Sequence, residues 1–166
     1  MATVTTTEAP VVDQRIGCWV ETNLKCLPLG FFVAGKDHDR SVGIIRGHYK
    51  NKFYIGKYVE GYGVYIPDGD TEVNIKLDKD HIFEILCDSK LSWDRCGGKV
   101  PANAFVAGHT EDGKQLNIGK TNMKGNTVVG WIQYNLLYYT WEGTTYNIAN
   151  FEVLVPNFCV EHRQIN

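Results

Sequence analysis

The sequence predicts an all-β fold in which two pseudo-symmetric antiparallel β repeats pack into one body. Three features lead to this prediction: an internal repeat, apolar runs that are too short for helices, and turn sequences at regular intervals. The repeat is clearest in the sequence Phe-Val-Ala-Gly, which occurs at residues 32–35 and again at 105–108. Each half also closes on Phe-Glu-aliphatic-Leu, at residues 83–86 and 151–154.

A chain of 166 residues, with 43% hydrophobic and 22% charged residues, can bury one core but is short for two independent domains. We therefore expect two repeats that share a core. The expected segments are a loose N-terminal tail over residues 1–14, a first repeat over 15–90, a second repeat over 91–157 and a C-terminal tail over 158–166.

The expected strands are short runs rich in Val, Ile, Tyr and Phe, which favour β-structure, and none keeps a helical period for three turns. In the first repeat they lie at residues 30–34, 41–45, 52–59, 63–67 and 82–87. In the second repeat they lie at residues 104–107, 115–118, 127–134, 136–141 and 150–155.

Turn sequences separate these runs, as hairpins require. Examples are Pro67-Asp68-Gly69, Asp112-Gly113 and Glu142-Gly143, where proline presets φ or glycine supplies a positive φ. The acidic run at residues 68–72 has its glycine in the second position, which does not fit a calcium-binding loop, so a hairpin tip is expected there. The strands could form two similar packed sheets or one sheet wrapped on itself.

Charge and cysteine usage narrow the function classes. Lys and Arg number 17 against 19 Asp and Glu, without a basic block, so no nucleic-acid partner is expected. The first residues do not resemble a secretory signal, and no apolar run is long enough for a transmembrane segment. The cysteines form no Cys-x-x-Cys pair, which favours free thiols in a reducing compartment; they are Cys18, Cys26, Cys87, Cys96 and Cys159. We expect a cytoplasmic protein, with vesicle association or non-classical secretion left open.

The sequence points away from catalysis, and no cofactor or metal is expected. The histidines show no metal-ligand spacing, and neither a glycine-rich phosphate loop nor a Gly-x-Ser-x-Gly motif is present. A hydrolase acting on glycans would need two carboxylates across a cleft, and Asp37 and Asp39 lie too close together along one turn.

Each half follows one pattern: Trp near the start, then Pro, an aliphatic-Ala-Gly step, an aliphatic-Gly pair, Tyr and the closing Phe-Glu motif. The second half carries it most fully, in Trp93, Gly97-Gly98-Lys99-Val100-Pro101, Ala107-Gly108, Asp112-Gly113, Ile118-Gly119-Lys120, Gly130 and Phe151-Glu152-Val153-Leu154. The pattern resembles the DM-nine repeat family, which occurs in tandem in small invertebrate proteins and at the front of natterin-like toxins. The resemblance implies a calcium-independent, mannose-binding tandem-repeat lectin of all-β fold. It also implies pattern recognition of microbial glycans in innate immunity, by a homodimer or higher homo-oligomer.

The same resemblance implies the position of the mannose site. In the family, an acidic residue two positions after the Ala-Gly step and a lysine in the later Gly-Lys pair recognise mannose, and these fall on Asp37 and Lys57. The second repeat has Thr110 and Trp131 instead, so one competent site per chain is expected, built by the first repeat or lined by the second. The candidate lining residues are Lys36, His38, Asp39, Thr110 and Trp131.

These residue types suit a sugar because a carboxylate accepts hydroxyl hydrogens, a cation donates to hydroxyl oxygens, and an aromatic ring covers the C–H face. Without the resemblance, Asp37 is typical of a solvated turn and Lys57 of an outward-facing strand residue. We expect Trp19, Trp93 and Tyr139 in the core, whereas Trp131 is open to either role. The alternative function is an intracellular protein-interaction or vesicle-associated module without sugar binding.

Overall fold

A computed structural model describes residues 17–76, 78–87 and 90–157, so the expected tails and Cys159 lie outside the described residues. The described elements are β1 (Cys18–Thr22), β2 (Gly35–Asp37), β3 (Arg40–Tyr49), β4 (Lys52–Val59), β5 (Gly63–Asp68), β6 (Thr71–Ile75), β7 (Phe83–Cys87), β8 (Leu91–Gly97), β9 (Val106–His109), β10 (Gln115–Met123), β11 (Asn126–Gln133), β12 (Leu136–Trp141), β13 (Thr144–Ile148) and β14 (Asn150–Pro156). Within these described stretches, no helix has the length and apolar character needed to cross a membrane.

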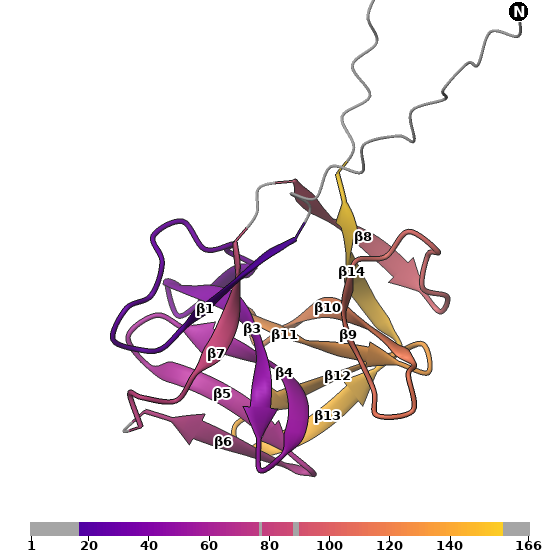
Figure 1. Ribbon diagram of the computed structural model, residues 1–166. Helices are drawn as coiled ribbons and strands as arrows, with labels where there is room; N and C mark the ends of the chain where they lie inside the picture. Colours follow the sequence, from indigo (N-terminus) through magenta and orange to yellow (C-terminus); the bar gives the residue numbers. More distant parts are fainter. Residues whose placement is uncertain (1–16, 77, 88–89, 158–166) are drawn as a thin grey trace, which may run out of the picture.

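The strands form one antiparallel sheet with the order β1-β7-β3-β4-β5-β6-β13-β12-β11-β10-β14-β8, with β2 beside β3 and β9 beside β10. This order is symmetric about its centre, because each first-repeat strand stands as far from the middle as its second-repeat counterpart. Figure 1 shows the two halves side by side, with the earlier strands in purple and the later ones in orange and yellow. The predicted fold class is therefore confirmed, in the form of one continuous sheet.

The halves join along a short seam between β6 and β13. Thr71 pairs with Thr144, and the Thr145 amide donates to the Asp70 carbonyl at 3.0 Å. Both strands start just after tight turns, and the β5–β6 turn at Gly69 is the hairpin tip expected for residues 68–72. The tips of two hairpins therefore make the seam.

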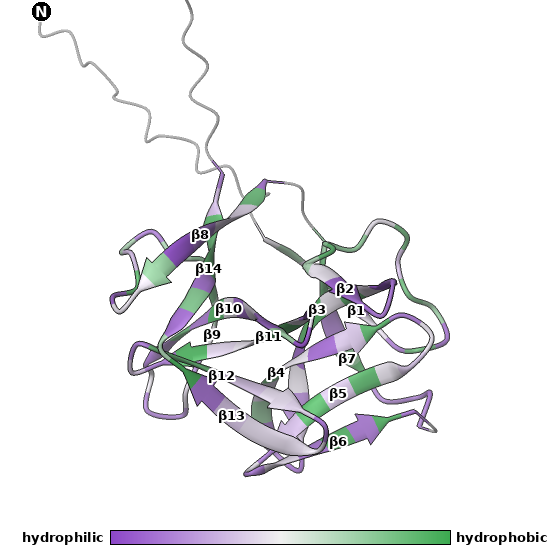
Figure 2. Ribbon diagram, turned by 180° about the vertical axis from the view of Figure 1, so that it is seen from behind, coloured by the Kyte–Doolittle hydropathy of each residue, from purple (hydrophilic) through white to green (hydrophobic). Residues whose placement is uncertain are grey.

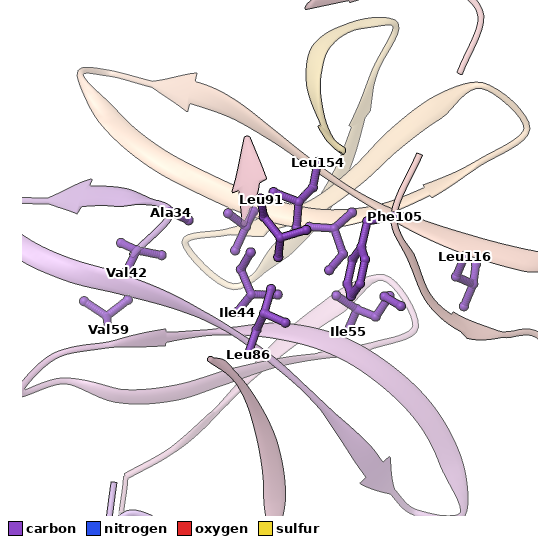
Figure 3. Packing of buried hydrophobic residues seen from close by; sticks show 13 residues of the cluster. Ala34, Val42, Ile44, Ile55, Val59, Leu86, Leu91, Phe105, Leu116 and Leu154 are labelled. Atoms are coloured by element: carbon purple, nitrogen blue, oxygen red, sulfur yellow. The ribbon is translucent and has the colours of Figure 1, made fainter. Parts of the chain in front are cut away.

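The central hydrophobic core lies between the repeats and takes residues from both. Figure 3 shows Ile44 and Leu86 of the first half facing Leu154 of the second, and all three are fully buried. Each half has a further cluster of its own, made of residues from that repeat. Figure 2 shows hydrophobic and hydrophilic residues along the same strands, as expected where strands bury only part of their length or one face. The aromatic residues expected in the core, Trp19, Trp93 and Tyr139, do pack against these clusters.

Reciprocal hydrogen bonds link the two repeats at their Ala-Gly steps. The Arg46 guanidinium donates to the Ala107 carbonyl oxygen at 2.7 Å, and the Lys120 ammonium donates to the Ala34 carbonyl oxygen at 3.1 Å. Arg46 also lies over the Trp19 ring, as Lys120 lies over the Trp93 ring. Each repeat therefore holds the Ala-Gly step of the other in place.

The glycines of these steps are required by close packing. A Cβ atom on Gly35 would lie 2.0 Å from Oγ1 of Thr127, and one on Gly108 would lie 2.6 Å from the Phe53 ring. Thr127 and Phe53 are the second residues of the equivalent strands β11 and β4, so the same approach occurs in both halves. The glycine of each Ala-Gly motif is thus required by a close contact with the other repeat.

Turn length explains one difference between sequence and structure. The sequence pattern aligns Tyr65 with Tyr139. In the structure, however, Lys57 pairs with Tyr65, and its counterpart Trp131 pairs with Tyr138. The β4–β5 connection is one residue longer than the turn at 134–135, which shifts the alignment by one position. Because a shift of one residue changes the face of the sheet, the structural counterpart of Tyr65 is Tyr138.

The expected strand at residues 30–34 is not a strand. The segment runs extended over the sheet and makes isolated hydrogen bonds, from the Phe32 amide to Leu86 and from the Ala34 amide to Val42. Its apolar side chains pack partly against the core clusters without a ladder partner.

Candidate functional site

Asp37 ends strand β2, immediately before a two-residue turn. The turn residues His38 and Asp39 both have positive φ, 46° and 68°, so the chain reverses tightly into β3. The backbone amide of His38 donates to the side chain of Asn126 at 3.0 Å, which fixes this turn against the second repeat. The Asp37 side chain is 16% exposed, so it does not behave as a solvated turn residue.

Lys57, in the middle of β4, faces the space between the repeats. It is only 4% exposed, and its ammonium donates to the Thr140 carbonyl oxygen at 3.1 Å. The same nitrogen lies 5.2 Å from the centre of the Tyr65 ring and 5.5 Å from that of Trp141, distances at which a cation is attracted to a ring face. Lys57 is therefore an inward-facing residue held by both repeats.

Two acidic side chains lie close enough to act on the Lys57 ammonium. Oε2 of Glu72 is 3.7 Å away, an ion-pair distance that is too long for a good hydrogen bond. Burial lowers the pKa of Lys57 below its ordinary value of 10.5, and the charges of Glu72 and Asp37 partly offset this effect. Asp37, Lys57 and Glu72 therefore form one electrostatic group.

Two buried polar atoms beside Lys57 have no hydrogen-bond partner among the described residues. They are Oε2 of Glu72 and Nε1 of Trp141, on side chains that are 7% and 8% exposed respectively. Buried polar groups in proteins are nearly always satisfied, so such a pair requires an explanation. One is an acceptor and the other a donor, which is what a ligand hydroxyl can satisfy.

The other first-repeat residues expected to line the site point to solvent. Nδ1 of His38 contacts the Asp37 carboxylate at 2.7 Å, but the His38 side chain is 73% exposed. Lys36 and Asp39 are exposed, and the Lys36 ammonium donates to the hydroxyl of Ser41 at 3.2 Å. They stand at the rim of the group formed by Asp37 and Lys57.

Thr110 and Trp131 lie elsewhere, in the lining of a separate cavity of about 580 Å³ to which both repeats contribute. The Trp131 ring stacks on Tyr138 with centroids 5.7 Å apart, just as Lys57 lies over Tyr65. This cavity is the pseudo-symmetric counterpart of the Asp37–Lys57 site. The structure thus separates the residues that the sequence placed in one site into two sites.

The residues that sequence reasoning missed are Tyr65, Glu72 and Trp141. A signal existed for Glu72. Counting residues outward from the hairpin tip at Gly69 pairs Glu72 with Pro67, which lies two residues from Tyr65 and so on the same face of the sheet. Trp141 stands out in sequence only as one of several aromatic residues that could stack on a sugar, and its place beside Lys57 follows from the packing of the second repeat on the first. Within the described residues, no group of three or more His, Cys, Asp or Glu side chains is arranged to hold a metal ion.

Comparison with known proteins identifies the family. The model of the DM9 repeat matches residues 36–136, more than half of the chain. The chain belongs to the DM9 repeat family. DM9 repeats are β-structured binding domains known for carbohydrate binding. The match begins one residue before Asp37 and includes Lys57 and Glu72.

A solved structure supports the fold. The crystal structure of the nematode sperm cell motility protein MFP2B matches this DM9 protein with a TM-score of 0.55 and 9% sequence identity, over 85% of this chain. The chain spans only 44% of the MFP2B chain, and at this identity the likeness concerns the fold alone. No curated protein sequence matches the chain.

Proposed function

We propose that this DM9 protein is a non-enzymatic lectin that binds mannose-type glycans through Asp37 and Lys57. The Asp37 carboxylate accepts hydrogen bonds from sugar hydroxyls, and the Lys57 ammonium donates to a hydroxyl oxygen. The Glu72 carboxylate accepts a hydrogen bond from another hydroxyl, and the indole N–H of Trp141 donates one to a hydroxyl oxygen. Hydrogen bonds that involve charged groups are about twice as strong as neutral ones, which favours this set for a polyol.

The observation that carries this proposal is the pair of unsatisfied buried atoms beside Lys57, Oε2 of Glu72 and Nε1 of Trp141. Leaving a buried polar atom unpaired costs about 1–3 kcal/mol, and a ligand hydroxyl at this position removes that cost. A group with a purely structural role would be expected to have both atoms hydrogen-bonded. Family membership points in the same direction.

Single-sugar affinity is expected to be weak, because each hydroxyl gives up water; a Kd of about 1 mM corresponds to about −4 kcal/mol. Useful binding to a glycan-coated microbial surface then requires several sites in one assembly. We therefore propose a homodimer or higher homo-oligomer acting in pattern recognition. Light scattering on the purified protein tests this part, and a strict monomer contradicts it.

The test of the site is titration with methyl α-mannoside, followed by calorimetry or saturation-transfer NMR. Asp37→Asn removes the charge but keeps the shape, and we expect it to weaken binding by at least about tenfold, equivalent to about 1.4 kcal/mol. Asp39→Asn is the matched control, because Asp39 is exposed two residues away. Thermal unfolding of both variants shows whether the fold is kept.

Glu72→Gln gives a second readout, because Gln retains an acceptor oxygen but loses the charge. We expect weaker mannoside binding, with Asp39→Asn unchanged. Binding that is undiminished in both Asp37→Asn and Glu72→Gln would remove the site assignment.

An alternative function is supported by a different observation. The loop between β1 and β2 exposes Leu29 completely and Val33 by 47%, which suits a contact with another protein. In this alternative the chain is a cytoplasmic interaction module that gathers on vesicles. A glycan array without any mannose signal, together with a specific protein partner lost in Leu29→Ser, would select it.

A further inference from the structure

The cavity of about 580 Å³ that contains Thr110 and Trp131 is lined by both repeats and has the size of a small-molecule site. Its position repeats that of the Asp37–Lys57 group, with Trp131 in the place of Lys57. Trp141, which closes the first site, ends β12 opposite Thr144, and Asp68 ends β5 opposite Thr71 in the same way. A smaller aspartate thus replaces the tryptophan that fills the first site.

The walls of this cavity combine aromatic rings with polar side chains that have no hydrogen-bond partner among the described residues. Trp131 and Phe53 both line it, and stacking on Tyr138 fixes the plane of Trp131, with 14° between the two rings. The lining side chains of Asn51, His109 and Gln133 make no hydrogen bond to any described residue. The amides offer a donor and an acceptor each, and a neutral imidazole does the same.

The charges around this cavity do not favour an ionic ligand. Asp68 is engaged by the Lys50 ammonium at 2.9 Å, while Lys52 and Glu111 on the rim are exposed and opposite in sign. Neither an anion nor a cation finds an excess of opposite charge. A neutral polyhydroxylated ring matches the walls, because its hydroxyls can meet the amides and its C–H face, which is slightly positive, can meet the indole face.

We propose that this cavity is a second saccharide site, which takes an uncharged pyranose on the Trp131 ring. Asn51, His109 and Gln133 bind its hydroxyls. The ligand class rests on the proposed function of the first site, but the second site uses none of the same side chains. Each chain then carries two sugar sites of different chemistry, one charged and one neutral and aromatic.

The experiment uses the full chain and NMR titration with four neutral probes: the methyl glycosides of mannose, glucose and galactose, and N-acetylglucosamine. The indole N–H signal of Trp131, assigned from Trp131→Phe, reports on the second site, and that of Trp141 reports on the first. We expect at least one probe to shift the Trp131 signal in Asp37→Asn, where the first site is impaired. Gln133→Ala should raise the Kd for that probe about tenfold, while the exposed Gln115→Ala, outside the cavity, should leave it unchanged.

The outcomes separate the two proposals. A Trp131 response that survives Asp37→Asn and weakens in Gln133→Ala supports the second site, even if mannoside fails to shift Trp141 and the first site falls. Failure of every probe to shift Trp131, while Trp141 responds to mannoside, overturns the second site and leaves the first. A calorimetric Kd for the same probe that is unaffected by both Gln133→Ala and Trp131→Leu in the Asp37→Asn chain, with thermal unfolding unchanged, also overturns it.

Discussion

The buried ammonium of Lys57 gives the sharpest test of the structure through Lys57→Met. Methionine has a similar length and no charge, so the packing volume is nearly kept while the cation is removed. Glu72, at 7% exposure, then keeps its negative charge with no cation beside it, and the Thr140 carbonyl oxygen loses its 3.1 Å donor. The variant therefore isolates the energetic role of the charge.

Removing one partner of a buried ion pair costs about 3–5 kcal/mol. The lower end applies here, because Oε1 of Glu72 still accepts a hydrogen bond from the Gly143 amide at 3.4 Å. For a chain of this size, about 3 kcal/mol lowers the Tm by about 6–12 °C. Glu72→Gln on top of Lys57→Met removes the orphaned charge, so the double variant should recover about half of the loss.

Urea unfolding of the wild type, both single variants and the double variant measures this cycle directly. We expect a coupling energy between Lys57 and Glu72 of about 1–3 kcal/mol. Additive losses, or a Lys57→Met variant within about 0.5 kcal/mol of wild type, would refute the inference that Lys57 and Glu72 form a coupled, buried charge pair.

Three further predictions concern other parts of the molecule. Burial lowers the pKa of His81, whose Nε2 lies 2.9 Å from the Tyr54 hydroxyl. The stabilisation from neutral His81 is therefore complete above the unfolded pKa of about 6.5 and is lost as the pH falls from there toward the folded pKa. The urea midpoints at about pH 7.5 and about pH 5 should differ more in wild type than in His81→Gln. Gly35→Ala should lower the free energy of unfolding by about 1–3 kcal/mol, because the added Cβ meets the Thr127 side chain. Adding Thr127→Ala to the same chain should restore part of this stability. Equal thermal stability of Gly35→Ala and wild type contradicts the close approach. Cys18 and Cys87 are both free thiols and stand directly opposite each other on β1 and β7. Treatment with diamide should join them in a disulfide that peptide mass mapping detects, and Cys18→Ser should abolish the cross-linked peptide. Finding both thiols free after oxidation contradicts this geometry.

The strands that could be predicted from the sequence are those with a run of apolar or aromatic residues. The predictions for 52–59 and 136–141 match β4 and β12 residue for residue. The strands missed are short or polar, such as the three-residue β2 and the Thr- and Asn-rich β13. These are paired because neighbouring strands offer them hydrogen bonds, which is a tertiary effect that local composition does not encode.

The candidate site was only partly predictable, for a similar reason. Asp37 and Lys57 stand out through the family pattern, but an isolated lysine in a strand is typically exposed. It is buried here because Tyr65 and Trp141 surround its ammonium and Thr140 accepts its hydrogen bond. Two of these residues belong to the other repeat, so only the folded pairing of the halves shows them.

The contacts of Lys57 come from both halves of the chain, and this limits how such a protein can be divided. A single repeat expressed alone would keep Asp37 and Lys57 but lack the Trp141 indole and the Thr140 carbonyl oxygen that hold the ammonium. Under the proposed function, separately produced fragments should therefore bind no mannoside apart and bind it again only on reassembly. If the proposed sugar site is correct, the tandem rather than the single motif is the smallest unit that can be transplanted or engineered to carry it.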